Sequence, residues 1–317
     1  MASYWRFPGM PSRDYAVSVR SFHPAQPVGA ALGGPREGAE ARYVPGAASV
    51  REDMVNLAGS AGLPLWLDVR HEKLVWAQPL ERLETLAHGY ETVRCGVRDP
   101  AAPLPDPIYW FFPNVVLATD RAVFQEGGVQ HSLWLLRPGR IGEEYIKTEG
   151  HTLVRPDGVR CSQAYGVVYG RALFLLQELG EGPAQLPGCL QVGDVRWIEA
   201  QSGQKVLVPP TYGTVIINLG SEPLVVSSLQ ATLAWPVHRV YEERQGAAYL
   251  VVEREGSMVV EPNRRYPGLL PPISRREPSC EPDLGIVAGV PLYSAYVLWP
   301  WRFTWLLEGI PATAGVG

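Results

Sequence analysis

From residue 108 to residue 262 the chain is a succession of short hydrophobic runs separated by proline and glycine turns. The runs are rich in Val, Ile, Leu, Tyr and Trp, a composition typical of β-strands. Strands at this spacing close into a sandwich or a barrel, so the pattern predicts an all-β fold. The runs fall at residues 108–118, 131–139, 143–148, 164–170, 172–177, 195–200, 205–210, 214–220, 224–234, 247–253 and 256–262, the last two as a hairpin.

The chain before the first run has a different pattern. Residues 1–48 are rich in Gly, Pro and Ala and have no apolar period, which indicates an arm or loop rather than a core element. Residues 50–62 and 79–91 carry apolar residues at helical spacing, and glycine ends the pattern in both. We therefore expect two short helices before the strands.

An apolar, aromatic segment, VPLYSAYVLWPWRFTWLLEG, lies at residues 290–309. Pro291, Pro300 and Arg302 interrupt it before it reaches the roughly 20 residues of a membrane-spanning helix, so no membrane association is expected. We interpret it as core packing, with a subunit interface as the alternative, and we expect the chain to form a homodimer. The expected organisation is an arm at 1–48, a helical or irregular addition at 49–104, a barrel at 105–255 and a C-terminal extension at 256–317.

Charge and cysteine content narrow the classes of function. The 317 residues include 28 Lys and Arg against 32 Asp and Glu, and no basic stripe indicates nucleic-acid binding. The start MASYWRFPGMPSRDY lacks the charged and apolar regions of a signal peptide, which favours a cytoplasmic location. Four cysteines without a C-x-x-C pair predict neither a zinc site nor a disulfide framework.

Four stretches between residues 138 and 253 carry a family resemblance. They are PGRIGEEYIKTEGH, QAYGVVYGRALFLLQ, VLVPPTYGTVIINLGSEPLVV and GAAYLVVE. Together they resemble the cupin-type glucose-6-phosphate isomerases of archaea and some bacteria, over roughly residues 105–255. The resemblance implies a cupin barrel, also called a double-stranded β-helix or jelly roll, and the interconversion of glucose 6-phosphate and fructose 6-phosphate. Gly170, Gly203, Pro209 and Asn218 keep the frame of the two cupin motifs.

The resemblance also implies a divalent metal, bound by two histidines and a glutamate from the first motif and a third histidine from the second. Those four positions hold His151, Leu153, Gln163 and Thr214 here. Leucine has no donor atom, the amide and the hydroxyl offer neutral oxygens, and one imidazole does not hold a divalent ion at physiological concentrations. No metal cofactor is therefore expected. Because Gln163 cannot act as a base, the family's metal-dependent isomerisation is expected to fail.

Two further histidines offer an alternative metal site. His131 alternates with apolar residues in an expected strand, so its side chain is expected to point into the barrel. His238 falls near a position where the family has a histidine close to the substrate. A rebuilt site from His131, His151 and His238 is the alternative to metal loss, although a histidine on an apolar strand face is usually a hydrogen-bonded core residue. The candidate catalytic residues are His151, Gln163 and His238.

The residues kept from the family suit binding. Thr148 and Gly150 match its K-T-x-G segment, where a hydroxyl and backbone amides meet the sugar phosphate, and Tyr165 matches a tyrosine two positions beyond the lost glutamate. Lys147 offers a charge for the phosphate. Three functions stay open at this point: an aldose–ketose isomerase, a metal-free cupin that binds a sugar phosphate, and a structural or assembly module.

Overall fold

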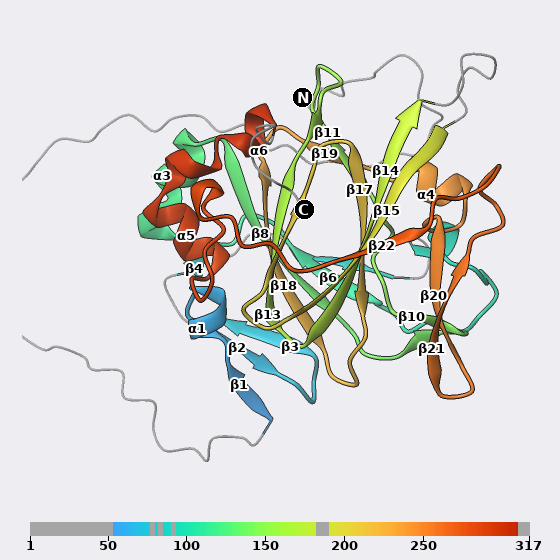
Figure 1. Ribbon diagram of the computed structural model, residues 1–317. Helices are drawn as coiled ribbons and strands as arrows, with labels where there is room; N and C mark the ends of the chain where they lie inside the picture. Colours follow the sequence, from blue (N-terminus) through green and yellow to red (C-terminus); the bar gives the residue numbers. More distant parts are fainter. Residues whose placement is uncertain (1–52, 77–79, 82–84, 90–92, 182–189, 310–317) are drawn as a thin grey trace, which may run out of the picture. The chain divides into compact units, whose positions relative to one another are not determined.

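A computed structural model describes residues 53–76, 80–81, 85–89, 93–181 and 190–309. All of them belong to one compact unit that spans residues 49–317. The arm expected at residues 1–48 lies outside the described residues. Figure 1 shows the described part as a β-barrel with short helices packed beside it.

Two sheets make the barrel, and their neighbouring strands are antiparallel except for the last pair of the smaller sheet. Across the six-stranded sheet the order is β16 (Lys205–Val208), β13 (Gln163–Tyr169), β18 (Leu224–Ala231), β8 (Val129–Leu136), β6 (Tyr109–Phe112) and β5 (Leu86–His88). Across the four-stranded sheet it is β17 (Tyr212–Asn218), β14 (Arg171–Glu181), β15 (Leu190–Gln201) and β22 (Ile273–Arg276).

Both faces of both sheets are covered by apolar side chains. Residues such as Trp134 and Phe174 pack between the sheets in the barrel interior. The C-terminal segment covers the outer face of the six-stranded sheet, and residues around Tyr241 cover that of the four-stranded sheet. As a result β17 and β18 are buried at every position, which explains why neither strand contains a charged residue or alternates strictly between apolar and polar side chains.

Smaller sheets and short helices complete the unit. The smaller sheets consist of β1 (Met54–Asn56), β2 (Leu65–Asp68) and β3 (Lys73–Trp76); β21 (Ser257–Pro262), β20 (Tyr249–Arg254), β10 (Glu144–Tyr145) and β9 (Arg140–Ile141); β12 (Arg160–Cys161), β11 (Thr152–Val154) and β19 (Trp235–Val237); and β4 (Leu80–Glu81) and β7 (Val116–Leu117). The helices are α1 (Ala58–Ala61), α3 (Arg121–Glu126), α4 (Arg239–Glu243), α5 (Leu292–Leu298) and α6 (Trp305–Glu308), with single 3-10 turns η1 (Arg94–Gly96), η2 (Ala118–Asp120), η3 (Pro282–Leu284) and η4 (Pro300–Phe303).

The predicted all-β cupin barrel is confirmed, and so is the hairpin near residue 255, which is β20–β21. Both main sheets also recruit strands from outside residues 105–255. β5 joins the edge of the six-stranded sheet, and β22 adds a parallel strand to β15.

The two helices expected before the barrel are largely absent from the described residues. At 50–62 the structure has β1 followed by the single turn α1, which ends as expected at glycine, Gly62, with φ +73°. The helix expected at 79–91 is wrong over its described residues, because Leu80 pairs with Leu117 and Leu86 pairs with Phe111 in sheets. Pairing with neighbouring strands overrides the helical spacing of the leucines.

The aromatic C-terminal segment packs on the barrel. Tyr293, Tyr296, Phe303 and Trp305 are buried in the cluster that also contains Leu133 of β8. This confirms core packing as the role of most of its aromatic residues, while Trp301 is 65% exposed. Within the described residues, no helix is both long enough and apolar enough to cross a membrane.

Candidate active site

The segment that carries the first motif lies along β17, the strand that carries the second. His151 and Thr214 are direct antiparallel partners, with backbone N–H···O distances of 3.1 and 2.8 Å. Gly150 has φ +83°, and a Cβ at this position would lie 2.4 Å from a ring carbon of Tyr241. Glycine is therefore required here by both backbone conformation and space. The fold brings the two motif positions together, as the motif frame predicts.

His151 is held in a closed hydrogen-bond network with two residues of β13. The amide nitrogen of Gln163 donates to Nε2 of His151 at 3.0 Å, and the hydroxyl of Tyr165 donates to Oε1 of Gln163 at 2.7 Å. The Tyr165 hydroxyl also lies 3.3 Å from Nε2 of His151. All three side chains are buried, and Trp134 stacks on the imidazole with ring centroids 6.1 Å apart.

Burial keeps His151 neutral. The pKa of His151 is lowered to about 3, mainly by the loss of solvent and in addition by the nearby His238, while the hydrogen bond from Gln163 acts in the opposite direction. A neutral imidazole has one nitrogen that can accept a hydrogen bond or bind a metal. In His151 that nitrogen is Nε2, and it accepts from Gln163.

Within the described part of the chain, the side chains at the other two motif positions, Leu153 and Thr214, make no contact typical of a metal ligand. Leu153 packs in a small apolar cluster with Cys161, Ala231 and Ala234. The Thr214 side chain is fully buried, and its hydroxyl has no hydrogen-bond partner among the described residues.

His131 does not join this site, so the expectation that it points into the barrel is wrong. It lies on the outer face of β8, beside the rings of Phe124 and Tyr293, and its Nδ1 donates to the carbonyl of Val115 at 2.8 Å. Trp134, an odd number of residues further along the same strand, points to the interior instead. The combination of His131, His151 and His238 is therefore not assembled.

His238 does approach the site. Its ring centroid lies 5.9 Å from that of His151, and its Nδ1 donates to the carbonyl of Gly150 at 2.8 Å. A carboxylate oxygen of Glu149 lies 3.5 Å from the same nitrogen. On the other side of Glu149, its second carboxylate oxygen lies 3.6 Å from Nδ1 of His88.

We refer to His88, Glu149 and His238 as the polar cluster. Sequence reasoning identified His238 and missed the other two. Glu149 occupies the variable position of the K-T-x-G segment, and its charge, two residues before His151, could have drawn attention to it. His88 sits in a segment for which a helix was expected, and no local pattern in the sequence predicts its approach.

The predicted substrate-binding residues are engaged in contacts within the protein. The ammonium of Lys147 lies 2.6 Å from Glu144, and both side chains are almost fully buried. The hydroxyl of Thr148 accepts a hydrogen bond from the backbone N–H of Ile216 at 3.0 Å. The ion pair lies within β10 and the segment that follows it, and the Thr148 hydrogen bond joins that segment to β17. Contact with a phosphosugar stays a prediction for these residues.

A family model described as glucose-6-phosphate isomerase (GPI) matches residues 102–267, just over half of the chain. Among curated proteins, the chain is similar to the glucose-6-phosphate isomerase of Pyrococcus furiosus, with 27% identity over 45% of this chain and 67% of that protein. It is also similar to that of Thermococcus kodakarensis, with 28% identity over 48% of this chain and 77% of the relative.

Two of the solved structures that match are a vicilin from Capsicum annuum and an oxalate decarboxylase–formate complex from Lactobacillus farciminis. The vicilin match has 12% identity and a TM-score of 0.30, and it covers 43% of this chain and 32% of that one. The oxalate decarboxylase match has 17% identity and a TM-score of 0.28, over 43% of this chain and 33% of the other. The chain thus spans about a third of each of these structures.

Proposed function

The chain belongs to the glucose-6-phosphate isomerase family, and from that premise we propose that it binds a sugar phosphate or a related hydroxylated anion without a divalent metal and without metal-dependent isomerisation. The proposal keeps the barrel and its ligand class from the family. In place of metal-dependent isomerisation, protein side chains alone would bind the ligand.

The hydrogen bond between Gln163 and His151 carries this proposal. Coordination of a metal by Nε2 would require the lone pair that now accepts from the Gln163 amide, and breaking that bond would leave a buried amide N–H without a partner. The network with Tyr165 holds the amide in this orientation. His151 is therefore better suited to a structural role than to metal binding.

The remaining donors do not fit a divalent metal. The side chain of Leu153 is a hydrocarbon packed among apolar neighbours, and Thr214 and Gln163 supply neutral oxygens. Divalent transition metals prefer imidazole, thiolate or carboxylate ligands. His151 is the one imidazole among the four motif positions, and its Nε2 already accepts a hydrogen bond from Gln163, so the site is too weak for a metal. No step of a mechanism can be routed through a metal here.

Proton transfer by the family route is also disfavoured. Isomerisation moves hydrogen between two adjacent carbons of the open-chain sugar, and a base must accept a proton in the process. An amide at position 163 cannot accept that proton at physiological pH. Binding without turnover is the function that these residues support best.

The polar cluster supports binding of a polar molecule. Both ring nitrogens of His88 and one carboxylate oxygen of Glu149 are buried without a hydrogen-bond partner within the described residues. Nδ1 of His88 and this Glu149 oxygen face each other at 3.6 Å, which leaves Nε2 of His88 with no polar neighbour within the described residues; buried polar atoms are nearly always hydrogen-bonded, so this atom indicates water or a ligand at this place. Hydroxyl groups of a sugar can donate to the carboxylate and either donate to or accept from an imidazole.

A structural role is the second candidate, favoured by the contacts of Lys147 and Thr148. Both residues match positions where the family meets its substrate, but here they form a buried ion pair and a strand-to-strand hydrogen bond. If the segment that contains Lys147 and Thr148 only stabilises the fold, the barrel serves as a scaffold for assembly.

Thermal unfolding in the presence of fructose 6-phosphate separates the two candidates. A ligand that binds only the folded state raises Tm as its concentration passes Kd, so the binding function requires a saturable rise at millimolar ligand. Tyr165→Phe should reduce the rise, whereas Tyr169→Phe on the same strand, whose hydroxyl contacts the exposed Glu222, should leave it unchanged. An unchanged Tm for the unmodified protein would favour the structural role and overturn the binding proposal.

A further inference from the structure

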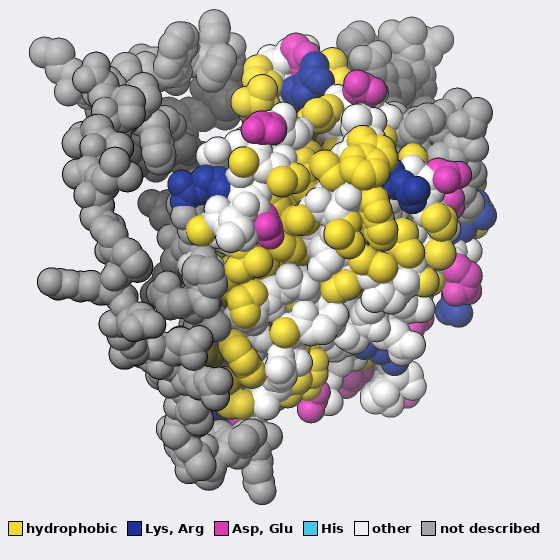
Figure 2. Space-filling view, turned by 90° about the vertical axis from the view of Figure 1, so that its left-hand side faces the viewer, with side chains coloured by type: hydrophobic (Ala, Val, Ile, Leu, Met, Phe, Trp, Pro, Cys, Tyr) yellow, Lys and Arg dark blue, Asp and Glu magenta, His cyan; other side chains and the backbone are white. Residues whose placement is uncertain are grey.

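Hydrophobic side chains are exposed on the face of the molecule where α3, α5, η4 and α6 lie, which we call the C-terminal face. Figure 2 shows hydrophobic side chains gathered in the middle of this face and charged side chains mostly around them. Leu298 of α5 and Trp301 of η4 are 56% and 65% exposed. Leu233, which is 70% exposed, adjoins the same face, because the N–H of the preceding Thr232 donates to the carbonyl of Gly128, just after α3, at 2.8 Å.

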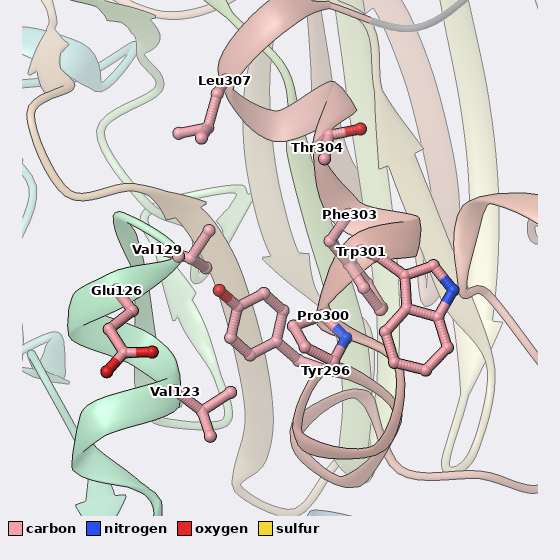
Figure 3. A pocket seen from close by; sticks show the side chains of 10 residues that line it. Val123, Glu126, Val129, Tyr296, Pro300, Trp301, Phe303, Thr304 and Leu307 are labelled. Carbon is pink, nitrogen blue, oxygen red and sulfur yellow. The ribbon is translucent and has the colours of Figure 1, made fainter.

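The C-terminal face is also hollowed between α3 and the C-terminal helices. The hollow has a volume of about 460 Å³, and its walls include Val123 of α3, Tyr296 of α5 and Leu307 of α6 (Figure 3). Trp301 lies at its edge, where the side chain lines the hollow and is mostly exposed as well. Glu126 is the charged residue among the described lining residues, and it is open to water. Such walls offer few of the converging polar groups that fix a small molecule in a pocket, so they favour an apolar side chain as the occupant.

A projecting aromatic side chain beside an apolar hollow makes the C-terminal face complementary to itself. In a two-fold dimer the same patch of both subunits meets, so every contact between two positions occurs twice. The exposed indole of Trp301 in one copy can then enter the hollow of the other, while the reverse contact forms on the other side of the axis. Trp is also among the side chains that most often anchor protein interfaces.

The exposed apolar area is of the size that a dimer needs. At their exposed fractions, Leu233, Leu298 and Trp301 leave roughly 400 Å² of mostly apolar surface in water, and the walls of the hollow add to it. A standard interface covers about 800 Å² on each partner, and about 65% of a homodimer interface is apolar. These side chains and the hollow therefore supply the apolar core of such an interface, with the surrounding charged residues as its hydrated rim.

A membrane surface fits the C-terminal face less well than a second copy of the chain does. Segments that lie on membranes carry Lys and Arg beside their apolar side chains, which attract anionic lipids. Here the exposed carboxylates of Glu126 and Glu308 lie beside the apolar side chains instead. The nearby guanidinium of Arg302 donates to the carbonyl of Pro282 at 2.7 Å.

We propose that the chain forms a two-fold symmetric dimer through the C-terminal face, with Trp301 of each copy in the hollow of the other. The helices α5 and α6 and the turn η4 lie outside residues 102–267, which match the family model, so the family resemblance does not supply this contact. The dimer goes beyond the sugar-phosphate site proposed for the barrel and does not depend on it.

Sedimentation velocity of the full chain, from about 1 to about 100 µM, tests the proposal. We expect a reversible dimer with twice the chain mass of 34.8 kDa. Trp301→Ala should weaken dimerisation on the order of a hundredfold or more, because it removes two anchoring side chains from each dimer. Leu269→Ala is the control, since it shortens a fully exposed apolar side chain in the loop before β22 and should leave the dimer unchanged.

Mixing two variants distinguishes insertion of Trp301 from a general apolar contact. Val123→Trp fills the hollow and keeps the projecting indole, while Trp301→Ala keeps the hollow and removes the indole. Each variant alone should be largely monomeric. An equimolar mixture should form a heterodimer, because the indole of one chain then finds the intact hollow of the other. Circular dichroism of both variants confirms that they are folded.

An unmodified chain that stays monomeric up to the highest concentration would overturn the proposal. A dimer that Trp301→Ala leaves unchanged would do the same, because the contact would then lie elsewhere. A mixture that associates as weakly as each variant alone would show that Trp301 does not enter the hollow. Trp301-dependent binding of a monomer to phosphatidylcholine vesicles would assign the C-terminal face to a lipid surface instead.

Discussion

The side-chain amide of Gln163 donates a 3.0 Å hydrogen bond to Nε2 of His151. The resemblance to the cupin isomerases implies a glutamate and a histidine as metal ligands at these positions, and both would direct their lone pairs at the ion. Here one of the two residues has become the donor that the other accepts from. Compared with that ligand set, glutamine at position 163 offers one ligand fewer, and its amide occupies the nitrogen with which His151 would bind an ion.

Purified protein should contain less than on the order of a tenth of an equivalent of transition metal, because the site has lost most of its donors. Elemental analysis after expression in metal-supplemented medium measures this. Near-stoichiometric iron, zinc, nickel or manganese that disappears in His151→Ala would show that His151 binds a metal despite its contact with Gln163.

The conversion of fructose 6-phosphate to glucose 6-phosphate should show little or no turnover in a coupled assay, with or without added divalent metal. The reason is the missing base at position 163, since an amide does not accept the proton that leaves the sugar carbon. Robust turnover that His151→Ala abolishes, and that Tyr169→Phe leaves intact, would contradict this expectation.

The triple variant Leu153→His, Gln163→Glu, Thr214→His should raise metal content towards one equivalent. Thr214 directly opposes His151 across the strand pair, so a histidine at 214 has its Cβ about 5 Å from that of His151, as facing ligands require. Gln163→Glu alone is the matched control, and it should bind less metal than the triple variant. Leu153→His has the highest cost in stability, because Leu153 packs among Cys161, Ala231 and Ala234. A folded triple variant without metal would mean that the donors do not converge.

Stability should decrease as the pH falls from about 6.5 towards 4, because of the buried histidines. Burial lowers the pKa of His131 to about 4 in the folded protein, against 6.5 for an exposed histidine. Between these values the unfolded chain binds more protons than the folded one, so the free energy of unfolding rises with pH across this window and is lost on acidification.

For His131 alone the full effect is on the order of 3 kcal/mol. His151 adds to it, with its pKa lowered to about 3. Urea unfolding at pH 7 and pH 5 should show a smaller pH dependence for His131→Gln than for His71→Gln, since His71 lies on the surface. Equal pH dependence in the two variants would show that His131 does not carry the effect.

The strand runs and the motif frame could be predicted from the sequence because they depend on local order. Strands buried on both faces are rich in apolar residues and carry no charge, as β17 and β18 show. The proximity of His151 and Thr214 could be expected because the resemblance implies that both positions belong to one site, whereas their direct pairing is seen only in the structure. The substitutions at Leu153 and Gln163 were visible without any coordinates, and their chemistry alone predicted the loss of ligands.

Helical spacing misled where strand pairing was stronger. The leucines near residue 83 have the period of a helix, yet Leu80 and Leu86 pair with β7 and β6. A short segment adopts the conformation in which its backbone finds partners, and those partners lie about 25 to 40 residues further along the chain. No local window contains that information.

By itself, the sequence determined the all-β barrel, the family resemblance and the identity of the side chains at the metal positions, since these depend on residue type and spacing. Only the tertiary structure decided which way each side chain points and what it meets. In the folded chain His131 lies on the outer face of β8, Nε2 of His151 accepts a hydrogen bond from Gln163, and His88 lies beside Glu149. The reason is that these contacts join residues distant in the chain, and the faces of strands and the partners across them are fixed only when the sheets close.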